Sequence, residues 1–509
     1  MPISAFQKSL IFGVVLVFLF SSSFLVLWSL IGSHSFGWDE SVYLTKARSW
    51  IEGTPADQFG VYRPIGMASF GWLMLQFGES EQGVRMFGAI FGAVTLVFLF
   101  LLFRGVANIW VGLAVTVVTG TSLLFLREAP QFFNDVASSG VLFGVLWLVW
   151  KYYKSAGYSK AIYIAAPLAA LVFYIRYGVV LAFGVIGIVT VAVLLQKFAN
   201  KENSIFTPLG KTIGIFGILI LPHFIHSFLA TDNVLGILKS GGGAAGRQYL
   251  GEGLLHYAQW LPYTLAGPVV GGTALAGILI TIVILARKNL RQRYEGLLWL
   301  GAIGIGTLFV TGLLIHAEPR YIFFSVCLLS GVGIAGIYML LNDKPKILHT
   351  GFALLILLVA LPFGAIHYQQ AYAIVQNKKA DVHWEEYVHA YRNIQDDASE
   401  PGGCAVWAAD FRPQVSWYTK CSVFSVTDRT NTQKQLNDGS QKNYYSIVLT
   451  KSQNNQIKPE TAEQYGVLLQ EIYRSEENSS HLGRGQIIVY RINYQKPGVP
   501  QYIPNQAGD

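Results

Sequence analysis

Two adjacent acidic residues follow the first long apolar segment of the chain. Asp39 and Glu40 lie in the segment FGWDESVY, residues 36–43, directly after an apolar run over residues 10–31. A run of that length can cross a bilayer, so both carboxylates are predicted just beyond a membrane face. Asp39 is a favourable helix N-cap, and Tyr43 comes one turn later on the same helix face. A carboxylate at this depth can serve as general base on a lipid-borne substrate; a solvated loop acid is the alternative interpretation.

Further charged residues lie where other apolar segments end. Arg127 ends the third predicted span, Asp135 begins the fourth, and Arg176 lies at another end on the same side. Ionisable residues at membrane depth are costly, and they usually pair with one another or line a cavity. Two interpretations of Asp135 remain open. It can form an ion pair with Arg127 that caps the helix ends, or it can lie near Asp39 and position a substrate phosphate through a metal or another cation.

The segment HAEPRY, residues 316–321, places a base, an acid and a guanidinium in one turn between spans. Such a concentration favours a functional role, and guanidinium groups bind phosphate oxygens through two parallel hydrogen bonds. The predicted substrate-binding residues are Tyr43, Arg63, Arg127, Asp135, Arg176, Arg247, His316, Glu318, Arg320 and Tyr321. Glycine-rich nucleotide-binding motifs are absent where they would be needed, so we expect the activated donor to be carried by a lipid.

The composition is that of a multi-pass membrane protein. Of 509 residues, 52% are hydrophobic and only 13% are charged, whereas soluble domains have about 25% charged residues. The formal net charge is +8, but the basic residues form short clusters between apolar runs. This pattern indicates orientation by the positive-inside rule and not a nucleic-acid partner. The first apolar run lacks a cleavage site of small residues, so it is predicted to be a retained helix.

Eleven membrane spans are predicted, near residues 10–31, 84–103, 106–126, 136–150, 161–175, 178–196, 212–229, 263–286, 296–315, 321–341 and 347–367. With these spans, the basic clusters fall in alternate loops, at Lys8, Arg104, Lys151, Lys154, Lys160, Lys197, Lys201, Lys211, Arg287, Lys288, Arg291, Arg293, Lys344 and Lys346. The positive-inside rule then places the N-terminus in the cytoplasm, and the charged residues discussed above and the C-terminus outside it.

Two of the predicted external loops are long. Loop 32–83 is predicted to form two short interfacial helices on the membrane, one at residues 39–51 and one after Pro64; an ordinary loop with a hydrophobic patch is the alternative. Loop 230–262 contains a glycine-dense segment between Lys239 and Arg247. Glycine density favours a mobile segment, either a lid gated by substrate or a flexible connector.

The polar tail after the last span is predicted to be a separate soluble α/β domain. The chain thus divides into a transmembrane catalytic domain, residues 1–368, and an extracytoplasmic domain, residues 369–509. Cys404 and Cys421 both lie in the tail, where either a disulfide or two free thiols is compatible with the sequence. Cys327 lies in a predicted span, where it is expected to pack as a small apolar side chain.

Residues 1–368 resemble the GT-C glycosyltransferases, in particular the group of protein O-mannosyltransferases and lipid A aminoarabinose transferases. The resemblance is carried by Trp38-Asp39-Glu40 with Tyr43, Tyr62-Arg63-Pro64, Val84-Arg85-Met86, Arg127 with Asp135, Arg176, and Glu318-Pro319-Arg320-Tyr321. It implies a mainly α, polytopic GT-C helical bundle with catalytic residues Asp39 and Glu40. Arg63 departs from the family pattern, in which a lysine often precedes a pair of prolines.

The resemblance also implies a reaction. Asp39 would act as general base on an acceptor hydroxyl in an inverting transfer, a polyprenyl phosphate would leave, and the cationic residues would stabilise its charge. The implied partners are a polyprenyl-phosphate sugar donor, the bilayer of the cell membrane, and a protein, lipid or glycan acceptor. A divalent metal at Asp39 and Asp135 is left open. The alternative is a transporter or flippase, which predicts internal repeats and charges near the membrane midplane; neither is visible in the sequence.

Overall fold

The computed structural model describes residues 5–56, 63–198, 206–243, 249–260, 266–314, 318–341, 346–379, 382–398, 403–408, 410–426, 429–437, 443–452, 454–477 and 485–493. The chain forms two compact units, and each contains more than one stretch of sequence. Unit 1 comprises residues 1–31, 64–67 and 85–373, and unit 2 comprises residues 32–63, 68–84 and 374–509. Most of the predicted loop 32–83 therefore belongs to the same compact unit as the tail.

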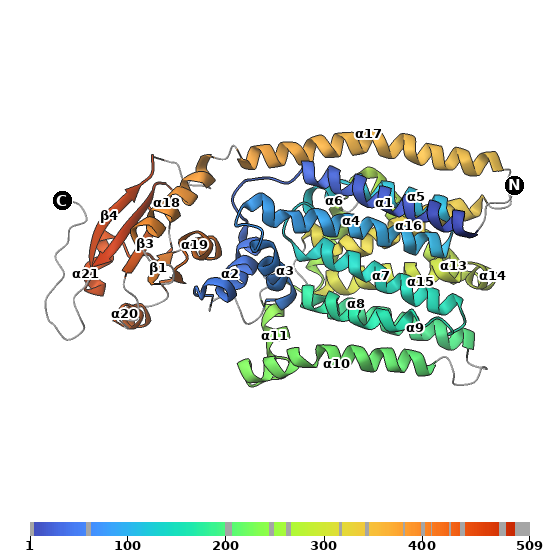
Figure 1. Cartoon of the computed structure of the whole chain (residues 1–509), viewed down its shortest axis with the longest axis horizontal. Helices are drawn as coiled ribbons and strands as arrows, with labels where there is room; N and C mark the ends of the chain where they lie inside the picture. The colour runs from blue at the N-terminus through green and yellow to red at the C-terminus, as the bar shows by residue number, and fades with distance from the viewer. Residues whose placement is uncertain are drawn as a thin grey trace. The chain divides into compact units, whose positions relative to one another are not determined.

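Unit 1 is a bundle of helices (Figure 1). Its elements are α1 (Ala5–Ser29), α4 (Glu81–Val106), α5 (Ile109–Gly120), α6 (Leu123–Glu128), α7 (Asn134–Lys154), α8 (Ile162–Ile175), the 3-10 turn η1 (Tyr177–Val179), α9 (Val180–Phe198), α10 (Phe206–Thr231), α11 (Gly236–Gly243), α12 (Glu252–Trp260), α13 (Pro268–Ala286), α14 (Lys288–Arg293), α15 (Glu295–Leu314), the 3-10 turn η3 (Pro319–Ile322), α16 (Phe323–Leu340) and α17 (Lys346–Lys379). The first residues of α4 and the last residues of α17 belong to unit 2.

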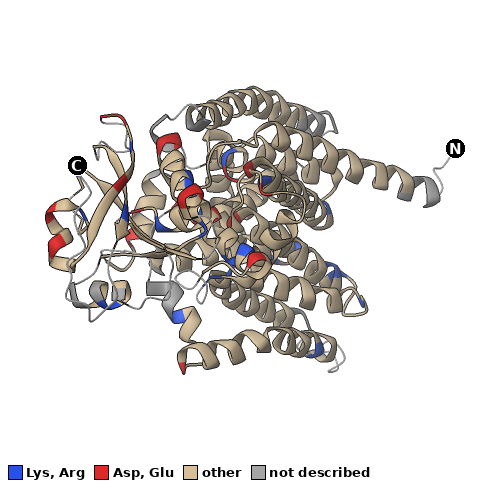
Figure 2. Ribbon diagram, turned by 60° about the vertical axis from the view of Figure 1, so that its left-hand side comes forward, with Lys and Arg blue, Asp and Glu red and all other residues tan. Residues whose placement is uncertain are grey.

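The long helices identify a multi-pass membrane protein. In the described part of the chain, nine helices are long and apolar enough to cross a membrane. Figure 2 shows that few charged residues lie along them. The nine coincide with nine of the eleven predicted spans. The other two predicted spans also form helices, but α5 has 12 residues and α8 has 14. Asn108 caps the start of α5 through its side-chain oxygen, and a 3-10 turn follows α8 at Arg176, so both helices have defined ends.

Glycines let two helices of the bundle approach closely. A Cβ added at Gly277 of α13 would lie 1.9 Å from the carbonyl oxygen of Leu329 in α16. One added at Gly333 of α16 would lie 2.0 Å from the carbonyl oxygen of Thr273. The hydroxyl of Thr273 lies 2.7 Å from that of Ser330, across the same contact. Small residues and interhelical hydroxyl bonds are the usual means of helix association in a bilayer.

This packing gives a stability prediction. We expect Gly277→Ala to destabilise unit 1 by about 1–3 kcal/mol, because the added methyl group meets backbone that cannot move aside. Gly272 in the same helix has open space at its Cβ position, so Gly272→Ala is the matched control. The measurement is the melting temperature in detergent, which should fall for Gly277→Ala and stay level or rise for Gly272→Ala. Equal melting temperatures would mean that the α13–α16 contact is not tight.

Unit 2 contains the two helices predicted in loop 32–83. α2 spans Trp38–Glu52 and α3 spans Ile65–Leu75. Pro64 and the first three residues of α3 belong to unit 1, and the rest of α3 belongs to unit 2. Val42 and Ala47 of α2 are buried, whereas Trp50 and Ile51 are exposed, at 42% and 44%. Both helices are therefore confirmed, and their position at the membrane surface stays a prediction.

The rest of unit 2 is a small α/β domain, as predicted for the tail. It contains α18 (Val382–Ala398), β1 (Cys404–Ala408), α19 (Arg412–Thr419), β2 (Ser422–Phe424), α20 (Arg429–Asn437), β3 (Asn443–Leu449), α21 (Pro459–Tyr465), β4 (Leu468–Arg474) and β5 (Ile487–Asn493). The strand order is β2-β1-β3-β5-β4. β1 pairs in parallel with β2 and β3, whereas β5 pairs antiparallel with β3 and β4.

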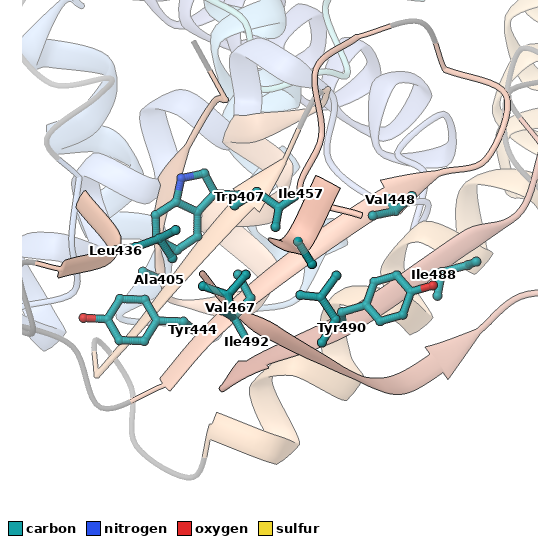
Figure 3. Close-up of a cluster of buried hydrophobic side chains, with 12 residues drawn as sticks. Ala405, Trp407, Leu436, Tyr444, Val448, Ile457, Val467, Ile488, Tyr490 and Ile492 are labelled. Carbon is teal, nitrogen blue, oxygen red and sulfur yellow. The ribbon is translucent and has the colours of Figure 1, made fainter. Parts of the chain in front are cut away.

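Apolar side chains of the sheet and of two helices form the core of this domain (Figure 3). Trp407 of β1, Tyr444 of β3 and Tyr490 of β5 are among its members, and all three are buried. Trp407 stacks on Tyr444 with their ring centroids 5.9 Å apart. Cys404 and Cys421 form a disulfide with a Cα–Cα distance of 4.8 Å, so of the two states compatible with the sequence the structure has the bonded one. Cys327 is buried in α16.

The glycine-dense segment is partly helical. Gly236–Gly243 forms α11, and the next described element is α12. Glycine lowers helix propensity by about 1 kcal/mol per residue, so the sequence predicted no helix at this place. Arg247 lies outside the described residues, as do Tyr62 and His316.

Candidate functional site

The first group of predicted site residues lies at the start of α2. The N-cap is Gly37, not Asp39 as the sequence predicted, and Glu40 at the third helical position completes a capping box with the Gly37 backbone. The Glu40 carboxylate is buried and its Oε2 accepts a hydrogen bond from the Gly37 N–H at 2.9 Å. Asp39 then directs its carboxylate to Arg63, whose Nη1 lies 3.2 Å from Oδ1. The two side chains of this pair are 20% and 24% exposed.

Arg63 also lies near an aromatic ring of α2. Its guanidinium carbon is 6.0 Å from the ring centre of Tyr43. Asp39, Tyr43 and Arg63 therefore form one group within unit 2, which we call the Asp39 group. Of the two predicted catalytic acids, Glu40 serves the helix cap, and Asp39 presents a partly exposed carboxylate next to a guanidinium and an aromatic ring.

The second group surrounds Asp135 at one end of unit 1. Asp135 is the second residue of α7 and its side chain is only 2% exposed. Its Oδ1 forms an ion pair with Nη1 of Arg176, the residue that ends α8. Its Oδ2 lies 3.7 Å from Nε of Arg320 in η3. Nε of Arg320 also lies 2.9 Å from Oε2 of Glu318, whose side chain is 40% exposed.

Aromatic residues complete this group. The guanidinium carbons of Arg176 and Arg320 lie 5.0 Å and 5.6 Å from the ring centre of Tyr321. The hydroxyl of Tyr257 in α12 donates to the carbonyl oxygen of Glu318 at 3.1 Å. Burial raises the pKa of Tyr257, so this phenol remains a hydrogen-bond donor. We call Asp135, Arg176, Glu318, Arg320 and Tyr321 the Asp135 cluster.

Of the two interpretations of Asp135 that the sequence left open, the structure does not have the ion pair with Arg127. Nη2 of Arg127 lies 2.7 Å from Oε1 of its neighbour Glu128, so the charge of Arg127 is satisfied locally. The two guanidiniums that pair with Asp135 come from turns that follow α8 and precede α16. Sequence reasoning selected Arg176 and Arg320 separately, but it could not tell which helix ends lie together. Tyr257 was missed, and a lone tyrosine in a glycine-dense loop carried no signal for it.

The charges of the Asp135 cluster suit a phosphate ligand. The one fully buried carboxylate balances one of two guanidiniums, and Glu318, which pairs with the second, is largely accessible to water. A phosphate can replace Glu318 at Arg320 and use the remaining N–H donors of Arg176. Guanidiniums held by a buried carboxylate are preorganised for this purpose.

The sequence left open a divalent metal at Asp39 and Asp135. No group of three or more His, Cys, Asp and Glu side chains among the described residues could hold a metal ion. Both aspartates pair with guanidiniums instead.

Asp135 should be important for stability, because its removal leaves two guanidiniums without a buried partner. We expect Asp135→Asn to lower the free energy of unfolding by about 2 kcal/mol, the usual size for a hydrogen bond to a charged group. The melting temperature in detergent measures the effect. Glu318→Gln, at the more exposed end of the same cluster, is the control and should change the melting temperature little. Equal effects of the two substitutions would show that Asp135 does not organise the cluster.

No protein-family model and no curated protein matches the chain. Solved structures do. The ArnT of Cupriavidus metallidurans in the apo state matches with a TM-score of 0.61 and 14% identity over 93% of this chain and 97% of that one. The same protein bound to undecaprenyl phosphate matches with a TM-score of 0.59 and 16% identity, with the same coverage.

An archaeal enzyme has a similar fold. The oligosaccharyltransferase AglB of Archaeoglobus fulgidus, in complex with an inhibitory peptide and a dolichol-phosphate, matches with a TM-score of 0.60 and 12% identity over 91% of this chain and 71% of that one. ArnT, a lipid A aminoarabinose transferase, and AglB are both GT-C glycosyltransferases. The chain therefore has the GT-C fold, which confirms the fold predicted from the sequence.

Proposed function

We propose that this chain is a membrane glycosyltransferase that moves a sugar from a polyprenyl phosphate to an acceptor hydroxyl, on the extracytoplasmic face. The observation that carries the proposal is the Asp135 cluster, in which a buried carboxylate holds two guanidiniums at one end of a bundle of apolar helices. Support also comes from the fold, since structures with this fold have been solved with undecaprenyl phosphate and with a dolichol-phosphate.

The proposed reaction is a single displacement with inversion. The oxygen of the acceptor hydroxyl attacks the anomeric carbon of the sugar, and Asp39 accepts the proton of that hydroxyl as general base. The bond between that carbon and the phosphate oxygen breaks, and its electron pair stays with the departing polyprenyl phosphate. Arg176 and Arg320 stabilise the charge that develops on this leaving group. Arg63 positions the Asp39 carboxylate, with which it is paired in the structure.

Other predicted residues keep more limited roles in the proposal. The remaining members of the two groups are proposed to contact the substrate, namely Tyr43 in the Asp39 group and Glu318 and Tyr321 in the Asp135 cluster. Three further residues stay predicted substrate contacts: Arg127, Arg247 and His316. The N-terminus is proposed to lie in the cytoplasm, because the positive-inside rule places the basic loops on that side of the membrane. The acceptor is a protein, a lipid or a glycan.

The test is to incubate the purified protein with polyprenyl phosphates that carry different sugars, together with a membrane extract as the source of acceptor. Release of polyprenyl phosphate with formation of a sugar–acceptor product supports the proposal. A transporter or flippase would instead move the lipid-linked sugar across a proteoliposome membrane without cleaving it. Transport without cleavage would therefore overturn the enzyme proposal.

A further inference from the structure

A pocket with a polar lining lies beside the Asp135 cluster, entirely within unit 1. Counted together with the solvent at its mouth, it holds about 490 Å³ of space not filled by atoms, and Arg176 and Tyr321 form part of its wall. Hydroxyl groups from three helices line it, namely those of Ser138 and Ser139 in α7, Thr307 and Thr311 in α15, and Ser325 in α16. Hydroxyls often bond between helices in a bilayer, and here five of them gather around one pocket that also contains an arginine.

Three of these hydroxyls are held in place by hydrogen bonds within the bundle. Thr307 Oγ1 donates to the carbonyl oxygen of Ile303 at 2.7 Å and lies 2.8 Å from Ser325 Oγ. Ser139 Oγ donates to the carbonyl oxygen of Asp135 at 2.7 Å. Each oxygen that donates in this way keeps lone pairs that can accept from a ligand. Leu142, Leu181 and Phe324 supply apolar wall between the hydroxyls.

The charge of the lining restricts the ligand. The described residues that line the pocket include one arginine and no acid. Asp135, the nearest buried carboxylate in the same helix as Ser138, is already paired with two guanidiniums. A ligand with several hydroxyls and no positive charge fits such a lining, whereas an ammonium group would find no carboxylate among the described lining residues to pair with.

We infer that this pocket binds the sugar of the donor and that the sugar is neutral, with hydroxyl and not amino substituents. The inference rests on the proposed function, because it takes Arg176 as a phosphate ligand and the sugar is covalently joined to that phosphate. The Thr307, Ser325 and Ser139 hydroxyls accept hydrogen bonds from the sugar hydroxyls, and the apolar residues contact its C–H faces.

Binding of three lipids to the protein in detergent tests this inference. They are undecaprenyl phosphate, the same lipid with a neutral hexose, and the same lipid with an aminopentose. We expect the neutral sugar to improve the Kd about tenfold or more over the lipid phosphate alone, and the aminopentose to improve it less. Thr307→Val and Ser139→Ala should each weaken binding of the neutral sugar lipid about 2- to 10-fold, the usual size for one lost hydrogen bond, without changing the Kd of undecaprenyl phosphate.

Thr116 of α5 is the matched control for Thr307. It is also buried and donates to the carbonyl oxygen four residues before it, but it does not line the pocket, so Thr116→Val should bind every lipid like the parent. Equal or tighter binding of the aminopentose lipid would overturn the inference, as would a loss of affinity in Thr307→Val that is the same for all three lipids. If undecaprenyl phosphate itself fails to bind, the proposed function fails as well, so the two failures are distinguishable.

Within unit 2, side chains of α19 form hydrogen bonds with the backbone at the start of α2. The short helix α19 packs on α2. Gln414 of α19 is only 2% exposed. In the amide orientation that satisfies both neighbours, its oxygen accepts from the Trp38 N–H at 3.0 Å and its nitrogen donates to the Phe411 carbonyl at 3.1 Å. The Tyr418 hydroxyl accepts from the Phe36 N–H at 2.9 Å and donates to Glu81 at 3.1 Å.

The position of α19 is itself fixed at both ends. Phe411 before it and Lys420 after it have left-handed backbone, with φ of 55° and 59°, a conformation that residues other than glycine adopt uncommonly. The disulfide joins Cys421, directly after this turn, to the first residue of β1. On the face toward α2, the guanidinium carbon of Arg48 lies 3.4 Å from the ring centre of Trp417.

From this geometry we propose that α19 positions α2, the helix that carries Asp39, so that Gln414 and Tyr418 affect the reaction through the orientation of Asp39. This proposal also assumes the proposed role of Asp39. Tyr418→Phe keeps the ring and removes the hydroxyl that fixes Phe36, three residues before Asp39. The matched control is Tyr445→Phe, because Tyr445 is a buried tyrosine of the same domain whose hydroxyl donates to Asp397 at 2.7 Å.

Two measurements separate positioning from stability. Hydrogen exchange of residues 36–41 should become at least several-fold faster in Tyr418→Phe and on reduction of the disulfide, but not in Tyr445→Phe. Turnover should fall about 3- to 10-fold in Tyr418→Phe at unchanged KM for the donor. Unchanged exchange at α2 would overturn the positioning role whether or not the chain is a transferase, and equal turnover in the two variants would do the same.

Discussion

The Asp39→Asn variant should transfer sugar about 10²–10⁴-fold more slowly than the parent chain, which is the usual contribution of a general base. Asparagine has the size of aspartate and can still accept a hydrogen bond from Arg63, but it cannot take the proton of the acceptor. The fold should not change, because Gly37 and Glu40 cap α2 and Asp39 does not. The measurement is the rate of polyprenyl phosphate release in the presence of acceptor, together with the melting temperature.

Asp397 provides a control with the same kind of contact. It forms an ion pair with Arg491, in which Nε lies 2.8 Å from Oδ2, and its side chain is 23% exposed, compared with 20% for Asp39. Asp397→Asn therefore removes an aspartate–arginine pair of similar exposure from the same unit. We expect it to affect stability slightly and turnover not at all. An Asp39→Asn variant that keeps more than a tenth of parental turnover would exclude Asp39 as the base.

Much of the fold could be predicted because the bilayer imposes it on the sequence. Apolar runs must be helical in a membrane, so nine predicted spans coincide with helices of sufficient length. The lengths of α5 and α8 were harder to predict, because an apolar sequence does not show where a turn ends a helix within a buried bundle. The helix of Gly236–Gly243 contradicts the intrinsic propensity of its glycines, and nothing local in the sequence indicates it.

The site was predictable as a set of residues but not as a set of contacts. Ionisable residues at the ends of spans are few, so Asp135, Arg176 and Arg320 could each be selected for chemical reasons. Their pairing depends on which helix ends lie together, which is decided by packing. The contact of Tyr418 with Phe36 joins residues 382 positions apart, and no pattern in either segment announces it.

Arg320→Met should weaken binding of undecaprenyl phosphate about 30-fold or more, since loss of one partner of a hydrogen-bonded charge contact costs 2–5 kcal/mol. Methionine keeps most of the apolar length of the side chain, so the contact with Phe133, whose ring centre lies 4.7 Å from the guanidinium carbon, is partly retained. Arg320→Lys should recover part of the affinity, because lysine restores the charge without the two parallel donors.

Arg104→Met is the control for the loss of one positive charge at a helix end. Arg104 lies in the last turn of α4, where its guanidinium carbon is 3.8 Å from the ring centre of Phe12, and it is not one of the residues of the Asp135 cluster. A general electrostatic attraction of the anionic lipid to a basic protein would weaken equally in both variants and would disappear at high salt. A specific phosphate site loses affinity only in Arg320→Met. Equal Kd values for Arg320→Met and the parent would remove Arg320 from the donor site and leave the two arginines as structural partners of Asp135.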